Sequence, residues 1–174
     1  MLIFYDIKLL DWNITINPNT DFVSAGFVAE DGSDLYIVNS GFNWDCSTSF
    51  LKNKVKPKLL TTKLTVNSSY EFVNKDFKRI IEDWISAKNT TVELVSAHYK
   101  PHDYLFLPSY PTNLEQWLKD LGSPKLPDQY QDWDYNALHD ARIIKNIYLW
   151  LKDTYSHPAW TQGLVAVLKN PKPE

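Results

Sequence analysis

The hydrophobic pattern near the start of the chain predicts three strands in succession. Residues 2–10 are dense in branched and aromatic side chains, as in a central strand that is buried on both faces. A second apolar run covers residues 21–30, and residues 35–39 form a third after Asp31-Gly32, a dipeptide typical of tight turns. The three segments together predict an antiparallel meander.

The middle of the chain is less regular. Residues 47–55 are compatible with a short helix that ends at Pro57. Ser68-x-x-Glu71 has the form of a helix capping box. The spacing of the apolar residues that follow predicts an amphipathic helix (Phe77, Ile80, Ile81, Trp84 and Ile85). Residues 91–97 predict a fourth strand, which we expect to run parallel to the first because a helix precedes it.

The second half of the chain predicts mainly helices. A short helix begins within residues 101–107, and Thr112-x-x-Glu115 is a second capping box, before a helix that Gly122 terminates. The longest helix begins near Ala137, where apolar residues recur at steps of three and four (Leu138, Ala141, Ile144, Ile147, Tyr148 and Leu151). One face of that helix is therefore expected to pack inward.

These elements predict an α/β fold, in which a mixed sheet of three antiparallel strands followed by parallel strands is flanked by helices. We expect one domain over residues 1–155, since 174 residues suffice to bury a core without disulfides or metals. Residues 156–174 form a tail, and its one apolar run at residues 164–168 indicates either an extra edge strand or a partner-binding segment.

Composition narrows the function classes. Seven Trp residues in one small domain favour core filling by default, with base stacking or a partner surface as the alternatives. A net charge of −3 provides no global basic field, so nucleic-acid binding would require a local patch. Cys46 is the only cysteine, which excludes an intrachain disulfide and a cysteine-based zinc site. Because no signal segment or membrane-length apolar run is present, we expect a soluble, cytoplasmic protein without a membrane partner.

Four motifs follow the order of these elements: Phe4-Tyr5-Asp6, residues 23–32 with 36–39, residues 114–127, and residues 135–142. The last reads Tyr-Asn-Ala-Leu-His-Asp-Ala-Arg and is similar to an H-N-A-L-x-D-A-R signature. Together the motifs resemble the DEDD-type 3′-to-5′ exonucleases with a histidine in the third motif (DEDDh). They are most similar to the small exoribonuclease branch common in mycobacteria and phages. The resemblance reaches about Tyr155 and implies a ribonuclease-H-like fold.

That family hydrolyses phosphodiesters with two divalent cations, about 4 Å apart, on which several carboxylates converge. The resemblance places Asp6 as the first aspartate and Asp140 as the last. Asp103 is the choice for the second motif, whereas a register one residue shorter places His102 there. The metal ligands implied by the resemblance are therefore Asp6, Asp103 and Asp140.

Two residues depart from the family pattern at chemically important positions. Lys8 stands where the family has a glutamate, two residues after Asp6 and on the same strand face. The charges of three aspartates and one lysine sum to about −2, which balances one divalent cation but not two. We therefore expect the site to hold at most one magnesium or manganese ion, or no metal. We expect Lys8 to pair with Asp6 and Asp140 in place of a metal.

Tyr135 stands at the position of the family's histidine base, and a phenol that titrates near pH 10 is a poor base at pH 7. His139 is expected to point about 100° away from its helical neighbour Asp140. His98 and His102 are the other candidate bases.

Structural alternatives stand beside each functional assignment. Lys8 could be a solvated residue of an edge strand, and Asp103 could cap the short helix that it begins. Asp140 could serve only the N-terminus of its helix, and Tyr135 could be only a core or staple aromatic.

Two functions follow. The first is an exonuclease-like protein that acts on or binds 3′ ends of single-stranded nucleic acid, with weak or absent turnover because of Lys8 and Tyr135. Lys100 and His102 would then contact the ligand, and bases would stack on aromatic residues (Tyr99, Trp12 and Trp133). The alternative is a catalytically dead pseudo-nuclease that serves as a binding or inhibitory module for a protein partner or a nucleotide.

Overall fold

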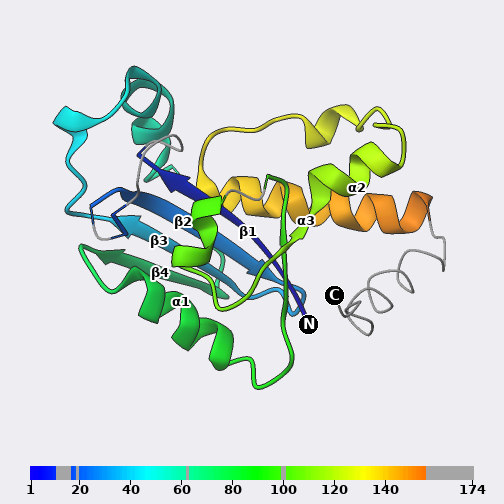
Figure 1. Ribbon diagram of the computed structural model, residues 1–174, viewed down its shortest axis with the longest axis horizontal. Helices are drawn as coiled ribbons and strands as arrows, with labels where there is room; N and C mark the ends of the chain where they lie inside the picture. Colours follow the sequence, from blue (N-terminus) through cyan, green and yellow to red (C-terminus); the bar gives the residue numbers. More distant parts are fainter. Residues whose placement is uncertain (11–16, 19, 62, 99–100, 156–174) are drawn as a thin grey trace, which may run out of the picture.

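A six-stranded mixed sheet forms the centre of the protein, with the strand order β4-β3-β2-β1-β5-β6 (Figure 1). The computed structural model describes residues 1–10, 17–18, 20–61, 63–98 and 101–155. The strands are β1 (Leu2–Leu9), β2 (Phe22–Ala29), β3 (Asp34–Asn39), β4 (Ser68–Val73), β5 (Glu93–Ser96) and β6 (Thr112–Asn113). β2 pairs antiparallel with β1 and β3, while β5 pairs parallel with β1 and β6. This arrangement confirms the predicted α/β class and is consistent with a ribonuclease-H-like fold.

The two faces of the sheet are covered by different helices. Because side chains alternate along a strand, Ile3, Tyr5 and Ile7 of β1 pack on the side of α1 (Phe77–Ser86). Phe4 packs on the other side, in a cluster with four buried residues of α3 (Ile143, Ile144, Ile147 and Leu151). α3 spans Ala137–Thr154, so the predicted long helix is confirmed. The even-numbered positions of β1, including Asp6 and Lys8, consequently share the face that carries α3.

Between β3 and β4 the chain forms three short helical pieces, η1 (Trp44–Cys46), η2 (Leu51–Val55) and η3 (Lys56–Lys58). Leu51, Val55 and Leu59 are buried in one cluster with the first turn of α3. The short helix predicted here is present, but Pro57 does not end it, since the turn of η3 includes this residue. Proline is tolerated in the first turn of a helical segment, where its missing N–H costs little.

The prediction of a capping box at Ser68 was wrong. Ser68–Val73 is β4, which pairs parallel with β3 at the edge of the sheet, and α1 begins only at Phe77. Pairing with a neighbouring strand outweighs a local capping pattern that the sequence alone cannot distinguish from strand. The second predicted cap was wrong by one residue, since Thr112 lies in β6. The residue that caps α2 (Leu114–Asp120) is Asn113, whose side chain accepts from Glu115 N.

Two further segments complete the described chain, η4 (Pro101–Leu105) and η5 (Asp128–Tyr130). Within the described residues, none of the helices has both the length and the apolar character needed to cross a bilayer. The tail at residues 156–174, with its predicted edge strand, lies outside the described residues.

Candidate active site

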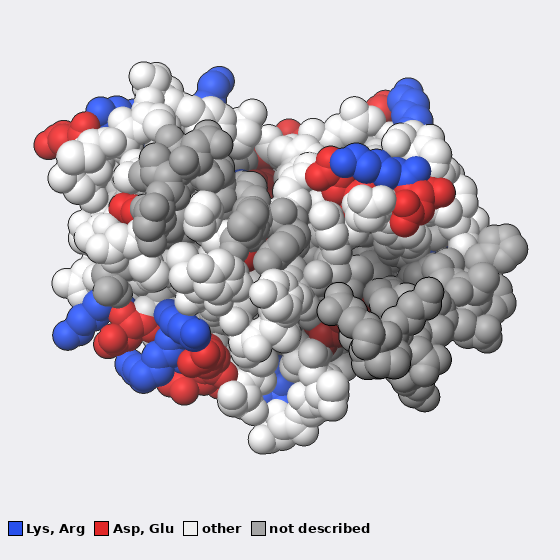
Figure 2. Space-filling model, viewed as in Figure 1, with Lys and Arg blue, Asp and Glu red and all other residues white. Residues whose placement is uncertain are grey.

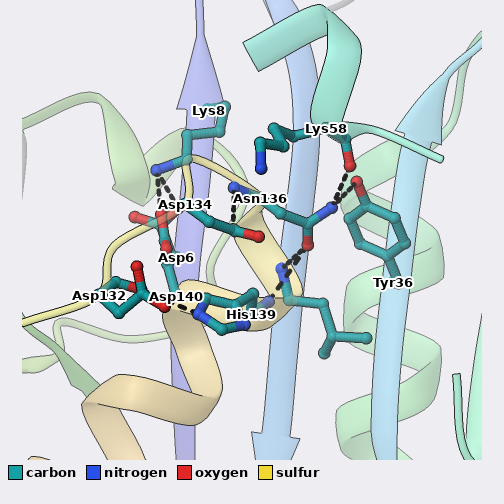
Figure 3. Close-up of polar contacts among 10 residues, drawn as sticks. Asp6, Lys8, Tyr36, Lys58, Asp132, Asp134, Asn136, His139 and Asp140 are labelled. Carbon is teal, nitrogen blue, oxygen red and sulfur yellow. Dashed lines mark hydrogen bonds and ion pairs between the residues drawn. The ribbon is translucent and has the colours of Figure 1, made fainter. Parts of the chain in front are cut away.

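Asp6, Lys8 and Asp140 meet between β1 and the first turn of α3 (Figure 3). The Lys8 Nζ atom lies 2.8 Å from Asp6 Oδ2 and 2.7 Å from Asp140 Oδ2. The predicted pairing of Lys8 with both aspartates is therefore confirmed. The alternative of a solvated edge-strand lysine is wrong, because β1 lies between β2 and β5 and only 16% of the Lys8 side chain is exposed.

A glycine on β2 allows α3 to approach the sheet at this point. Gly26 is the cross-strand partner of Asp6, and a Cβ atom added to it would lie 2.3 Å from backbone atoms of Leu138. No side chain fits in that space, so the first turn of α3 rests directly on β2. This close approach brings Asp140, two residues after Leu138, over β1 and within reach of Lys8.

Burial sets the electrostatics of the three groups. Asp140 is 1% exposed, and its burial raises the pKa of its carboxyl to about 6. The Lys8 cation lowers this pKa, whereas the negative charge of Asp6 raises it further. Burial alone would lower the pKa of Lys8, but the carboxylates of Asp6 and Asp140 outweigh it and raise that pKa. Lys8 therefore stays cationic at neutral pH. Asp140 Oδ1 is buried and makes no hydrogen bond with the described residues.

These residues do not fit a two-metal centre. Two divalent cations need several converging carboxylates, whereas here an ammonium already stands between the two that meet. Across the part of the chain that the structure describes, no three His, Cys, Asp or Glu side chains are arranged to hold a metal ion.

The structure places Asp103 on the other side of β1. Tyr5 and Asp6 are consecutive and point to opposite faces, and the Tyr5 hydroxyl donates to Asp103 Oδ2 at 3.0 Å in the layer of α1. Burial and the nearby charge of Asp103 raise the pKa of Tyr5. The three aspartates are thus not brought to one face, in contrast to the expected convergence. His102, the alternative residue for this motif, is half-buried, and its Nδ1 makes no hydrogen bond with the described residues.

Tyr135 lies at the surface just before α3, in a left-handed backbone conformation with a φ of 65°. That conformation is costly for a residue with a side chain, and three other described residues share it (Asp76, Asn89 and Ser123). The Tyr135 ring is 38% exposed and meets the ring of Phe50 edge-on, with 5.1 Å between centroids. Tyr135 is therefore not a core aromatic, but its ring does pack against Phe50 at the surface.

The histidines have other partners. His139 Nε2 lies 3.0 Å from the carbonyl oxygen of Asp132, so the ring turns away from Asp140 as expected. His98 Nδ1 lies 2.9 Å from Glu115 Oε2, and its ring is 6.4 Å from that of Trp133. Trp12, Tyr99 and Lys100, the other predicted ligand contacts, lie outside the described residues.

Sequence reasoning missed the residues that hold this site in place. Asn136 caps α3, because its Oδ1 accepts from Leu138 N and His139 N. Its Nδ2 donates to the Tyr36 hydroxyl at 3.0 Å and to the Lys58 carbonyl at 2.7 Å (Figure 3). An asparagine before an apolar helical run signals a cap, but no sequence signal reveals these two distant acceptors.

Two charged residues were also missed. Arg142 Nη2 lies 2.6 Å from Asp34 Oδ2, and Arg142 Nη1 donates to the Lys63 carbonyl at 2.8 Å. Asp134 accepts from Asn136 N, and its charge contributes to the raised pKa of Asp140. The region around Asp140 is therefore more acidic than Asp6 alone would make it.

No protein-family model matches the chain. Two curated relatives are 3′-5′ exoribonucleases of Mycobacterium tuberculosis, from strains CDC 1551 and H37Rv. Each is 26% identical to this chain over 156 residues, which cover 82% of this chain and 88% of the relative. The likeness supports an exonuclease family. Since the relatives align over most of both chains, the likeness involves the whole fold rather than a single motif.

Proposed function

We propose that this protein is an exonuclease-like protein of DEDDh ancestry that binds the 3′ end of single-stranded nucleic acid and hydrolyses it weakly or not at all. The similarity to two proteins named as 3′-5′ exoribonucleases supports the ligand class. The expected loss of turnover is argued from the Lys8 ammonium, which lies within 2.8 Å of both Asp6 and Asp140. It occupies the position at which carboxylates would otherwise meet a divalent cation.

Lys8 changes what the site can do with a phosphodiester. Two buried carboxylates by themselves repel a phosphate, and the lysine cancels one of their charges. The remaining net charge is too small for two divalent cations, so the attacking water is left without activation. The site is thereby poorly suited to cutting, and because a negative charge remains, cationic groups outside it must help to hold a terminal nucleotide.

The test is a trimming assay on 5′-labelled single-stranded RNA and DNA in manganese, run beside a binding measurement by fluorescence anisotropy. We expect the parent protein to bind but to trim slowly, and Lys8→Glu to trim at least tenfold faster. Trimming by Lys8→Glu should disappear again in Lys8→Glu/Asp140→Ala. Lys152→Glu, at an exposed position near the end of α3, is the charge-matched control and should behave like the parent.

Two results would overturn the proposal. Rapid trimming by the parent that Asp140→Ala abolishes would make it an ordinary nuclease. Failure of the parent to bind either polymer at any length would instead favour the alternative of a module for a protein or a nucleotide.

A further inference from the structure

A lysine-rich segment without any acidic residue lies beside the candidate site. Residues 47–70, here called the lysine segment, contain five lysines (Lys52, Lys54, Lys56, Lys58 and Lys63) and no Asp or Glu, in a chain whose net charge is −3. The charge of this segment is therefore opposite in sign to the net charge of the rest of the molecule. A local patch of this kind is what an acidic protein needs in order to bind a polyanion.

The fold directs these lysines to solvent. Leu51, Val55 and Leu59 recur every four residues and bury one side of η2 and η3 against the start of α3. All five lysines are exposed. The buried stripe fixes the backbone, so the cationic side chains project from a firmly packed support.

The lysine segment also lacks the compensating acids found elsewhere. In the described part of the chain, none of its five lysines forms an ion pair with an acidic side chain, whereas Lys78 and Lys119 pair with glutamates four residues away. Figure 2 shows blue and red side chains side by side over α1 and α2. Lys56 Nζ lies 5.1 Å from the centre of the Trp44 ring and Lys52 Nζ donates to the Asp45 carbonyl at 3.2 Å, but neither contact neutralises the positive charge. These charges can therefore attract an anionic partner.

Three contacts join this segment to the site. The Lys58 carbonyl accepts from Asn136 Nδ2 at 2.7 Å, and the Lys63 carbonyl accepts from Arg142 Nη1 at 2.8 Å. At the surface, the Phe50 ring meets that of Tyr135, five residues before Asp140. Phe50 is 50% exposed and Tyr135 38% exposed, so a flat ring remains open to solvent between the lysines and the site. Figure 3 shows the Lys58 side chain extending toward the side on which Lys8 lies.

From these observations we propose that the lysine segment is the docking surface for the body of a single-stranded nucleic acid whose 3′ end lies at Lys8. Lys52, Lys54, Lys56 and Lys58 contact the phosphates, and one base stacks on Phe50 or Tyr135. A cluster of cations beside exposed aromatic rings suits a single strand, because unpaired bases have open faces for stacking. This inference rests on the proposed function and adds the path of the polymer beyond the terminal nucleotide.

The first test measures affinity against salt concentration for 5′-fluorescein single strands of RNA and of DNA. The variant K52Q/K54Q/K56Q/K58Q keeps every backbone contact of Lys58 and should bind about tenfold or more weakly. Its slope of log affinity against log salt should shrink by about 3, or roughly 0.7 for each phosphate that the variant no longer neutralises. The matched control K75Q/K78Q/K119Q/K152Q removes four exposed lysines elsewhere and should keep the parent's affinity and slope.

The second test addresses the aromatic ring. Phe50→Ala should weaken binding about fivefold or more with little change in the salt slope, the loss expected for one stacked base. Phe72→Ala is its control, because Phe72 is 57% exposed on β4 at the edge of the sheet. A duplex of equal length should compete poorly with the single strands.

The outcomes separate this inference from the proposed function. If the parent binds single strands and the lysine variant binds them equally well, only the docking surface is wrong. Equal losses in the lysine variant and its control, or equal binding of the duplex, also overturn it. If the parent binds no single strand, the proposed function and this inference fail together.

Discussion

Lys8 lies on an inner strand within 2.8 Å of two carboxylates, where only 16% of its side chain reaches solvent. A pair of this kind contributes little net stability while intact, because desolvation offsets the attraction, but removing one partner leaves buried charge without compensation. Lys8→Met should therefore lower the free energy of unfolding by about 3 kcal/mol at pH 8, measured by urea denaturation. The loss should shrink at pH 4.5, where the carboxyl of Asp140 can take up a proton. Lys152→Met serves as the exposed control, and equal stability of Lys8→Met and the parent at pH 8 would refute the pairing.

At the scale of elements, the contact between β2 and α3 depends on Gly26. A methyl group there would overlap the backbone of Leu138, and neither the strand nor the helix can give way as a flexible side chain would. Gly26→Ala should destabilise the protein by about 1–3 kcal/mol or more, as expected for overpacking a tight contact. Gly41→Ala is the matched change, since its Cβ would lie 3.1 Å from Asn74 Cβ and no closer than 3.5 Å to any other atom. Thermal unfolding of the two variants provides the comparison, and equal melting temperatures would show that α3 can move away without cost.

A second element-level contact fixes α3 to β3, on the same face of the sheet. Arg142 pairs with Asp34, which is 3% exposed at the start of β3, and also binds the chain at Lys63. Arg142→Met leaves that aspartate buried without its cation and should cost about 2–3 kcal/mol, below the range for a fully buried pair because 28% of the Arg142 side chain is exposed. Arg142→Lys restores the charge but not both hydrogen bonds, so it should recover part of the loss in a denaturation experiment. An effect of Arg142→Met below about 0.5 kcal/mol would mean that water already satisfies Asp34.

For the molecule as a whole, the sequence predicts local features and misses those that depend on distant partners. α3 could be predicted because its apolar period is long, and the pairing of Lys8 followed from two residues on one strand face. β4 could not, because Ser68 and Glu71 fit a capping box equally well until β3 is placed beside them. Asp103 was assigned to the site from spacing alone, which does not reveal that its hydrogen bond goes to Tyr5 on the opposite face.

The pH dependence of global stability provides a test of the whole arrangement, since the protonation of one buried carboxyl is linked to unfolding of the entire domain. The pKa of Asp140 is about 6 in the folded protein and 3.8 for an ordinary aspartate, so the folded state holds an extra proton between these values. Its carboxyl should therefore remove stability as the pH rises from about 4 to about 7, and the penalty is complete above about pH 7. Asp140→Asn mimics the protonated form and lacks this slope. The variant should match the parent near pH 4 and exceed it by about 3 kcal/mol at pH 7.5, from 1.36 kcal/mol for each unit by which the pKa is raised. The stability of parent and variant is measured by urea denaturation across this range. Parallel curves would show that Asp140 is ionised throughout, so that the attraction of Lys8 outweighs the effect of burial on its pKa.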